Sequence, residues 1–385
     1  MDNFILRVPP MIHFGPNAAL KVGDEAVRLG AQKILIVTDS FLASSGVLEP
    51  IKESLAAKNL PFAIFAEVNT EPTIAHVDGC LALQKKEKAD LLVAVGGGSP
   101  IDVAKAVSFM ATNPGLIQDY MGLDKIKEKT LPLIATPTTA GTGSEATVTT
   151  IITDTVNNVK MLIMSPKLMP QVALVDPLLT LGMPKGLTAA TGLDALTHAI
   201  EAYVSKKASP LTDVLALSAI KLLVNNLPIA FTNPKDVPAR SNTLLGALEA
   251  GMAFSNSSVA LVHGMSRPVG ALFHVPHGIS NAALLGKVME FSLDGNYARY
   301  KDVALAMGLK DLGDDKKTAE SGAAKVTEII KALEVPTLSA LGVTKEKLDP
   351  VVAKMADDAI ASGSPGNNPK IATKEEIIAL YYASL

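Results

Sequence analysis

Short apolar runs alternate with amphipathic segments through the first half of the chain. Four of these runs are continuously apolar, which is typical of strands buried on both faces of a sheet. They span residues 33–39, 61–68, 90–99 and 131–138. Segments with helical spacing lie between them, for example 76–89. Strands that alternate with helices predict an α/β domain with a parallel sheet covered on both faces.

The pattern changes near residue 180. Residues 147–165 contain two β-rich runs around the polar sequence DTVNN, which predicts a hairpin. Beyond residue 186 the strand patterns fade, and long stretches rich in Ala, Leu, Ser and Gly follow a period of 3.6. We therefore expect two domains: an α/β domain over residues 1–180 and an all-α domain over residues 181–385.

Composition narrows the class of protein. The 385 residues are 48% apolar, which is enough for two buried cores. The net charge is −3 and no basic block stands out, so we expect no nucleic-acid partner. The single cysteine, Cys80, excludes an internal disulfide and any site with several thiolate ligands. It favours a reducing compartment, and no basic segment followed by an apolar one opens the chain, so we expect a cytoplasmic protein.

One segment, residues 244–262, has the length of a membrane span. It contains Glu249 and a polar cluster at 255–258. A buried helix of a helical domain fits this composition better, and we expect no membrane partner.

Three consecutive glycines, Gly96, Gly97 and Gly98, connect the third predicted strand to a helical segment. Glycine lets the backbone approach a ligand closely, and a helix N-terminus presents free N–H groups and a positive dipole end. Ser99 can cap this helix. The arrangement favours a pyrophosphate site over a turn needed only for packing, although its spacing differs from GxGxxG.

Asp39 ends an earlier predicted strand. A carboxylate there would accept hydrogen bonds from an adenosine ribose and repel a 2′-phosphate, which predicts NAD rather than NADP. The competing interpretation is a helix cap or turn residue. A second polar loop, residues 135–147, follows the fourth predicted strand, at the edge where open α/β sheets bind ligands.

Asp194 and His198 lie one turn apart in a helical pattern, so their side chains share one helix face. Two further histidines of the helical half, His263 and His277, complete a set of one carboxylate and three imidazoles. Such a set can bind a divalent metal and leave room for a substrate oxygen. Without thiolates, Fe²⁺ and Zn²⁺ are the main candidates. A single histidine is more often a core or cap residue, but the set, in a chain with two phosphate-type loops, favours a metal site.

Four motifs, in this order, resemble the iron-containing (group III) alcohol dehydrogenase family, whose members include lactaldehyde reductase and 1,3-propanediol dehydrogenase. The motifs are GGGSPIDVAKA, PTTAGTGSE, TGLDALTHAIEAYVS and VPHGISNAALL. The resemblance implies a Rossmann-like dinucleotide-binding domain followed by a helical metal-binding domain. It also implies NAD and Fe²⁺ as cofactors, small alcohols, diols or aldehydes as substrates, and a homodimer or larger assembly.

The resemblance also implies the residues of the site by their positions. The metal ligands would be Asp194, His198, His263 and His277. The dinucleotide would contact Asp39, Gly96, Gly97, Gly98, Ser99, Asp102, Thr136, Thr139 and Lys160. His277, Arg267, His274 and Phe254 would lie around the reacting atoms, with Phe254 as the aromatic wall of the substrate pocket.

One position departs from the family pattern. Many members carry a histidine implicated in proton transfer where this chain has Arg267. Arginine cannot act as a base at neutral pH. Either Arg267 grips an anionic group of the substrate or cofactor, or the proton relay differs and His274 supplies the imidazole.

Three other functions compete with that of an alcohol dehydrogenase. A glycerol or hydroxy-acid dehydrogenase of the same fold stays open. A dehydroquinate-synthase-like lyase would need a cluster of Lys and Arg for its acidic substrate, and the helical half offers only Arg267 near the expected metal. A nucleotide-binding scaffold without turnover is disfavoured by the Asp/His set.

Overall fold

The computed structural model describes residues 3–157 and 159–385, which fold into two compact units. The α/β unit comprises Arg7–Thr139 and Gly143–Leu181. The helical unit comprises Gly182–Leu385 together with the N-terminal segment up to Leu6 and the short segment Ala140–Thr142. The predicted fold class, a parallel α/β domain followed by a helical domain, is confirmed.

Six parallel strands form the main sheet, in the order β1-β9-β6-β4-β2-β3. They are β1 (Met11–Phe14), β2 (Ile34–Val37), β3 (Phe62–Phe65), β4 (Leu91–Gly96), β6 (Leu133–Pro137) and β9 (Val172–Val175). The four strands predicted from apolar runs are β2, β3, β4 and β6. The pattern did not predict β1 and β9, which form one side of the sheet.

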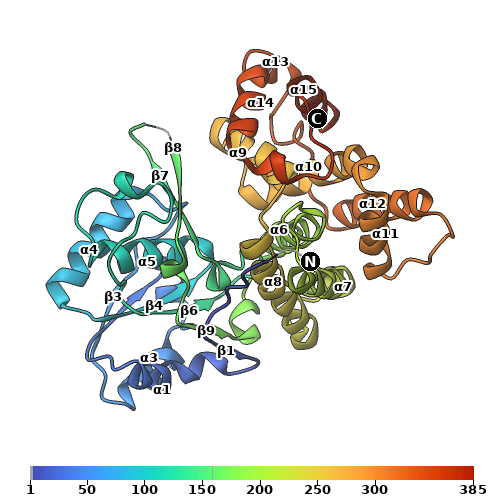
Figure 1. Ribbon diagram of the computed structural model, residues 1–385. Coiled ribbons are helices and arrows are strands. Elements are labelled where there is room, and N and C mark those ends of the chain that lie inside the picture. The colour runs from blue at the N-terminus through green and yellow to red at the C-terminus, as the bar shows by residue number, and fades with distance from the viewer. Residues whose placement is uncertain (1–2, 158) are drawn as a thin grey trace. The chain divides into compact units, whose positions relative to one another are not determined.

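Helices cover both faces of this sheet (Figure 1). One face packs against α1 (Val22–Arg28) and α3 (Glu49–Ala56), and the other against α4 (Ile74–Glu87) and α5 (Gly98–Met110). The short helix α2 (Ser40–Ser44) follows β2. Alternate residues of each central strand enter the two separate cores, and this double burial explains why the strands are continuously apolar.

The strand order reverses between β2 and β4. The chain runs from β2 outward to β3 and then returns to β4 on the other side of β2. In open α/β sheets, ligands bind at the carboxyl ends of the strands beside such a reversal. Here these ends carry Asp39, after β2, and Gly96–Gly98, after β4, and the two strands are paired, with Val37 opposite Ala94.

A second, three-stranded sheet contains β5 (Gly122–Leu123), β7 (Thr149–Asp154) and β8 (Val159–Met164). Strands β7 and β8 pair antiparallel, as the predicted hairpin requires. The last residue of the predicted turn, Asn158, lies outside the described residues.

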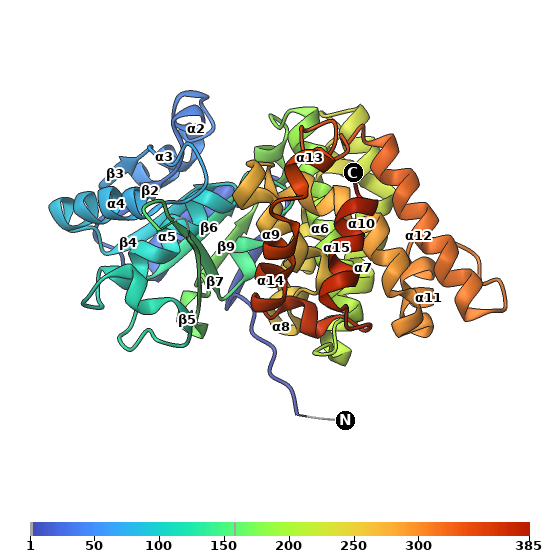
Figure 2. The same cartoon turned by 90° about the horizontal axis from the view of Figure 1, so that it is seen from above.

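The helical unit is built around α6, which is buried at almost every position from Thr188 to Val204 and packs against α7, α8 and α10 (Figure 2). Its longer helices are α6 (Lys185–Val204), α7 (Pro210–Thr232), α8 (Val237–Ser257), α9 (Leu261–Phe273), α10 (His277–Ser292), α11 (Tyr297–Ala306) and α12 (Asp315–Ala332). The remaining α-helices are α13 (Lys345–Leu348), α14 (Val352–Ala361) and α15 (Lys374–Ala383). Burial on all sides explains why α6 reads as apolar.

Within the described residues, one helix is long and apolar enough to cross a membrane, and it is α7. Its buried residues include Ala216, Leu223 and Leu227, and it packs against α6 and α8 as a core helix does. The apolar segment 244–262 noted in the sequence is not one helix, because it spans the end of α8 and the start of α9.

Candidate active site

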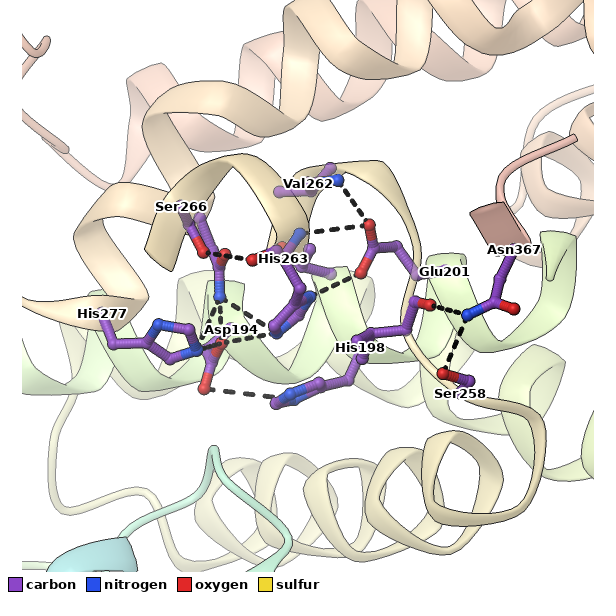
Figure 3. Close-up of polar contacts among 12 residues, drawn as sticks. Asp194, His198, Glu201, Ser258, Val262, His263, Ser266, His277 and Asn367 are labelled. Atoms are coloured by element: carbon purple, nitrogen blue, oxygen red, sulfur yellow. Dashed lines mark hydrogen bonds and ion pairs between the residues drawn. The ribbon is translucent and has the colours of Figure 1, made fainter. Parts of the chain in front are cut away.

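One face of α6 carries three buried chemical groups. Asp194, His198 and Glu201 lie at i, i+4 and i+7, so they project from the same side of the helix (Figure 3). Two other helices bring imidazoles to this face. His263 lies in the first turn of α9, and His277 is the first residue of α10.

The three imidazoles converge on the Asp194 carboxylate. The Nε2 atoms of His263 and His277 lie 3.6 and 3.7 Å from its Oδ1, and Nδ1 of His198 lies 4.0 Å from its Oδ2. Ligand atoms at the corners of a tetrahedron with bonds of about 2.1 Å are roughly 3.4 Å apart. One donor atom each from Asp194, His263 and His277 lie within 4.8 Å of one another, and these spacings fit a single divalent cation.

His198 stands at the side of this group of three residues. Its ring stacks on Phe254, with centroids 4.1 Å apart, and on His263, at 4.4 Å. Its Nδ1 atom is buried and has no hydrogen-bond partner in the described part of the chain. A buried nitrogen without a partner costs free energy, so this donor atom also fits a cation as its missing partner.

The charges of the cluster favour a cation. Burial alone would raise the pKa of Asp194, but the three imidazoles outweigh burial and hold that pKa far below its usual range. Burial lowers the pKa of His198 to about 3, so this ring is neutral at pH 7. Burial also acts to lower the pKa of His263, but Glu201 and Asp194 outweigh it and raise that pKa to about 9. A divalent cation that binds here takes the place of the His263 proton.

Two members of the cluster were missed in the sequence. Asn281, on α10, donates through Nδ2 to Asp194 Oδ1 at 2.7 Å, and this Nδ2 lies 3.1 Å from Nε2 of both His263 and His277. Glu201 contacts His263 from the other side. Helical spacing could have found both, because Glu201 is seven residues after Asp194 and Asn281 is four residues after His277.

Arg267 and His274 lie on the same helix as His263 but differ in environment. Arg267 follows His263 by one turn of α9 and is mostly buried, which lowers its pKa although Glu201 partly opposes this effect. His274 is exposed and ends α9 in a left-handed conformation with φ of 55°. Among the described residues, no hydrogen bond or ion pair joins either side chain to Asp194.

Close neighbours explain why glycines occupy the turn between β4 and α5. A Cβ at Gly96 would lie 2.6 Å from Pro100 Cγ, and a Cβ at Gly97 would lie 3.3 Å from Thr139 Oγ1. Helix α5 begins at Gly98, and its N-cap residue is Gly97, with no side-chain cap. The prediction that Ser99 caps this helix is wrong, because Ser99 already lies inside the first turn. The first N–H groups of α5 are therefore not capped by a side chain.

Polar groups surround the carboxyl ends of β2 and β6. Asp39 caps α2, with Oδ1 accepting from the Leu42 N–H at 2.7 Å, so the cap interpretation of Asp39 is confirmed. Among residues 3–157 and 159–385, none makes a hydrogen bond to its Oδ2. The hydroxyls of Thr38 and Thr136 are buried, and no described residue forms a hydrogen bond with them, which fits a polar ligand at this edge of the sheet.

Two other residues expected at the dinucleotide have protein partners. Asp102 is partly buried in α5, where its carboxylate accepts from Ser144 Oγ at 2.8 Å and from the Ile151 N–H at 3.0 Å. Lys160, on β8, forms an ion pair with Glu71 at 2.7 Å. The Asp102 contact holds β7, and the Lys160 contact holds β8. Neither contact tests whether these residues bind the dinucleotide.

A buried charge cluster beside Asp102 was also missed. Lys105 Nζ donates to Thr147 Oγ1 at 2.8 Å and to the Thr149 carbonyl at 2.9 Å. Burial lowers the pKa of Lys105 to about 8 and raises the pKa of Glu145 to about 7. The cluster ties α5 to the loop after β6. The sequence shows part of this cluster, because Lys105 follows Asp102 by three residues on one predicted helix.

The structure contains a parallel α/β unit with a glycine-rich turn at the carboxyl edge of its sheet and a helical unit with a carboxylate–imidazole cluster. Comparisons with known proteins give the family. Residues 9–177 match the family model of iron-containing alcohol dehydrogenase, and residues 188–385 match the C-terminal model of the Fe-containing alcohol dehydrogenase family.

Individual proteins agree with these models. The chain is 38% identical to the NAD-dependent methanol dehydrogenase of Bacillus methanolicus, over 98% of each chain. It is 39% identical to the lactaldehyde reductase of Escherichia coli strain K12, over 96% of this chain and 97% of that protein. The crystal structure of a 1,3-propanediol oxidoreductase matches all of both chains with a TM-score of 0.97 and 37% identity.

The chain belongs to the iron-containing alcohol dehydrogenase family. It is an NAD-linked oxidoreductase of alcohols and aldehydes, and the family implies Fe²⁺ as its metal. The resemblance noted in the sequence is confirmed, and the lyase and scaffold alternatives are set aside.

Proposed function

We propose that this enzyme oxidises small primary alcohols or diols, and reduces the corresponding aldehydes, with one Fe²⁺ held by Asp194, His198, His263 and His277. The observation that carries the proposal is the convergence of three imidazoles on one buried carboxylate. When bound, such a metal polarises the substrate oxygen and lowers the pKa of an alcohol.

The side chains of the cluster support distinct roles. The side chain of His277 is 41% exposed, whereas those of Asp194 and His263 are each 4% exposed. We therefore place the approach of the substrate oxygen on the side of His277. Phe254, stacked on His198, supplies an apolar wall that fits the carbon chain of a small alcohol. His274 is exposed, which suits a group that exchanges protons with water.

NAD is assigned to the carboxyl edge of the main sheet. The pyrophosphate would lie on the N-terminus of α5, where no side chain caps the helix. The residues proposed to contact it are Asp39, Gly96, Gly97, Gly98, Ser99, Asp102, Thr136, Thr139 and Lys160. Residues 1–180 would form the dinucleotide domain, and residues 181–385 would form the metal and substrate domain.

A second substrate class rests on Arg267. A mostly buried guanidinium one turn from His263 favours an alcohol or aldehyde that carries a carboxylate. A matched pair of substrates separates the two classes: propane-1,3-diol and 3-hydroxypropanoate differ only in this group. Preference for the hydroxy acid, lost in Arg267→Ala, would favour the second class.

The proposal is tested by metal content and turnover in the same preparations. Anaerobically purified protein should hold about one iron per chain and change the NADH absorbance when mixed with NAD⁺ and an alcohol panel. His263→Ala should lose metal and turnover while its circular dichroism spectrum stays unchanged. The control is His13→Ala, which removes an imidazole that pairs with Glu25 in the other unit. Full metal content in His263→Ala would refute the ligand assignment.

We also propose a cytoplasmic protein that forms a homodimer or a larger homo-oligomer. The single cysteine, buried and unpaired, suits a reducing compartment. Sedimentation equilibrium tests the assembly, and a monomer at micromolar concentration would contradict it.

A further inference from the structure

Glu201 holds the first turn of α9 and the ring of His263 at the same time. Its Oε1 accepts from the Val262 N–H at 2.6 Å and from the His263 N–H at 3.3 Å. Its Oε2 lies 2.5 Å from His263 Nδ1 (Figure 3). The residue is 3% exposed, so water does not compete for these contacts.

The chemistry of these contacts decides which ring nitrogen carries a proton. An ionised carboxylate only accepts hydrogen bonds, so the proton shared with Glu201 belongs to Nδ1 of His263. Nε2, on the opposite side of the ring, faces Asp194 Oδ1 at 3.6 Å. With a cation between them, Nε2 offers its lone pair and Nδ1 keeps its hydrogen.

We infer that Glu201 is a positioning residue, which orients His263 and fixes the tautomer that presents Nε2 to the metal. The inference rests on the proposed ligand set. No role was assigned to Glu201 from the sequence, and its carboxylate contacts Val262 and His263. It acts through His263, as a second carboxylate hydrogen-bonded to the outer nitrogen of a metal-binding imidazole.

Replacement by glutamine cannot preserve all the contacts. With its amide NH₂ toward His263, glutamine needs Nδ1 as an acceptor, which moves the ring proton to Nε2, the nitrogen that faces the metal. With its carbonyl toward His263, the NH₂ group points at the N–H groups of Val262 and His263 and leaves both without an acceptor. Aspartate only accepts, so it preserves the tautomer, but it is one methylene too short for every contact.

The experiment compares metal affinity in Glu201→Gln, Glu201→Asp and a matched control. The control is Glu249→Gln, which makes the same change at a partly buried carboxylate elsewhere in the helical unit. Each metal-free protein is titrated with Co²⁺ against a chelator, and the visible spectrum of bound Co²⁺ is recorded. In parallel, ¹⁵N NMR of histidine-labelled, Zn²⁺-loaded protein reports which nitrogen of His263 carries the proton.

We expect Glu201→Gln to bind Co²⁺ roughly 10–100-fold more weakly than the wild type, with a changed spectrum. Glu201→Asp should fall between the two, and Glu249→Gln should match the wild type. Equal Co²⁺ affinity in Glu201→Gln and wild type, with only a lower melting temperature, would make Glu201 a cap of α9 and overturn the inference. Failure of the wild type to bind Co²⁺ or iron would instead refute the ligand set on which the inference rests.

Discussion

Gly278 sets the distance between α10 and α6 beside the cluster of Asp194 and the three histidines. It follows His277, and a Cβ added to it would lie 2.3 Å from the carbonyl oxygen of Ala190 and 2.8 Å from the carbonyl carbon. Ala190 lies one helical turn before Asp194 on α6. The obstacle is backbone inside a helix, so it cannot rotate away as a side chain could. Gly278→Ala should therefore push the first turn of α10, with His277, away from Asp194.

The size of the effect follows from these distances. Ordinary contact begins at 3.4 Å, so the two helices must separate by about 1 Å. Overpacking of this kind costs about 1–3 kcal/mol, and the gain from replacing glycine in a helix, about 0.5–1 kcal/mol, offsets it only in part. Metal ligands tolerate displacements of roughly 0.2 Å. We expect a net loss of about 1–2 kcal/mol in the free energy of unfolding, and at least about tenfold weaker metal binding.

The assay pairs thermal unfolding of the metal-free protein with Co²⁺ titration. For a folding unit of this size, 1 kcal/mol lowers the melting temperature by roughly 2–4 °C. The control is Gly186→Ala at the start of α6, where a Cβ meets nothing within 4 Å, so both stability and metal affinity should match or exceed the wild type. Unchanged Co²⁺ affinity in Gly278→Ala would refute the claim that close packing at Gly278 places His277.

Three further predictions concern the α/β unit. Asp39→Asn keeps a side-chain cap for α2, so stability should change by less than about 0.5 kcal/mol. The loss of negative charge should raise turnover with NADP relative to NAD roughly tenfold, and an unchanged ratio would remove Asp39 from the ribose site. Burial raises the pKa of Glu145 from 4.5 to about 7, so the folded state keeps a proton that the unfolded state releases. The free energy of unfolding, measured in urea, should therefore fall between pH 4.5 and 7 more steeply in the wild type than in Glu145→Gln, and equal slopes would contradict this. Burial raises the pKa of the Cys80 thiol, so a disulfide reagent should label Cys80 only on unfolding, and fast labelling of the folded protein would be inconsistent with the structure.

The sequence predicted the centre of the sheet better than its side. Strands β2, β4 and β6 are central and buried on both faces, so their apolar runs stand out, and the edge strand β3 is also continuously apolar, with the sequence FAIF. Strand β1 is an edge strand of four residues with no fully buried position, so it lacks that pattern. Strand β9 is buried but only four residues long, and Asp176 and Pro177 follow it at once, so its run reads as part of a loop.

The sequence alone could place only those residues of the candidate site that lie on a single helix. Helical spacing places Asp194 beside His198, and the same rule would have added Glu201. The position of His263 and His277 depends on how α9 and α10 pack against α6, which no local pattern encodes, so the sequence could name these two residues as members of a ligand set but could not place them beside Asp194. Ser99 failed as a cap because α5 begins at Gly98, with Gly97 as its N-cap, two residues earlier than a cap at Ser99 requires. The structure brings Asp194 and the three histidines together, and their role as ligands remains a prediction.

The most direct test of this role is anomalous diffraction at the iron edge from crystals of anaerobically purified protein. The account predicts one strong peak per chain, roughly 2.0–2.3 Å from an Asp194 oxygen and from one ring nitrogen each of His198, His263 and His277. A peak elsewhere in the molecule, or one that fewer than three of these side chains reach, would contradict it.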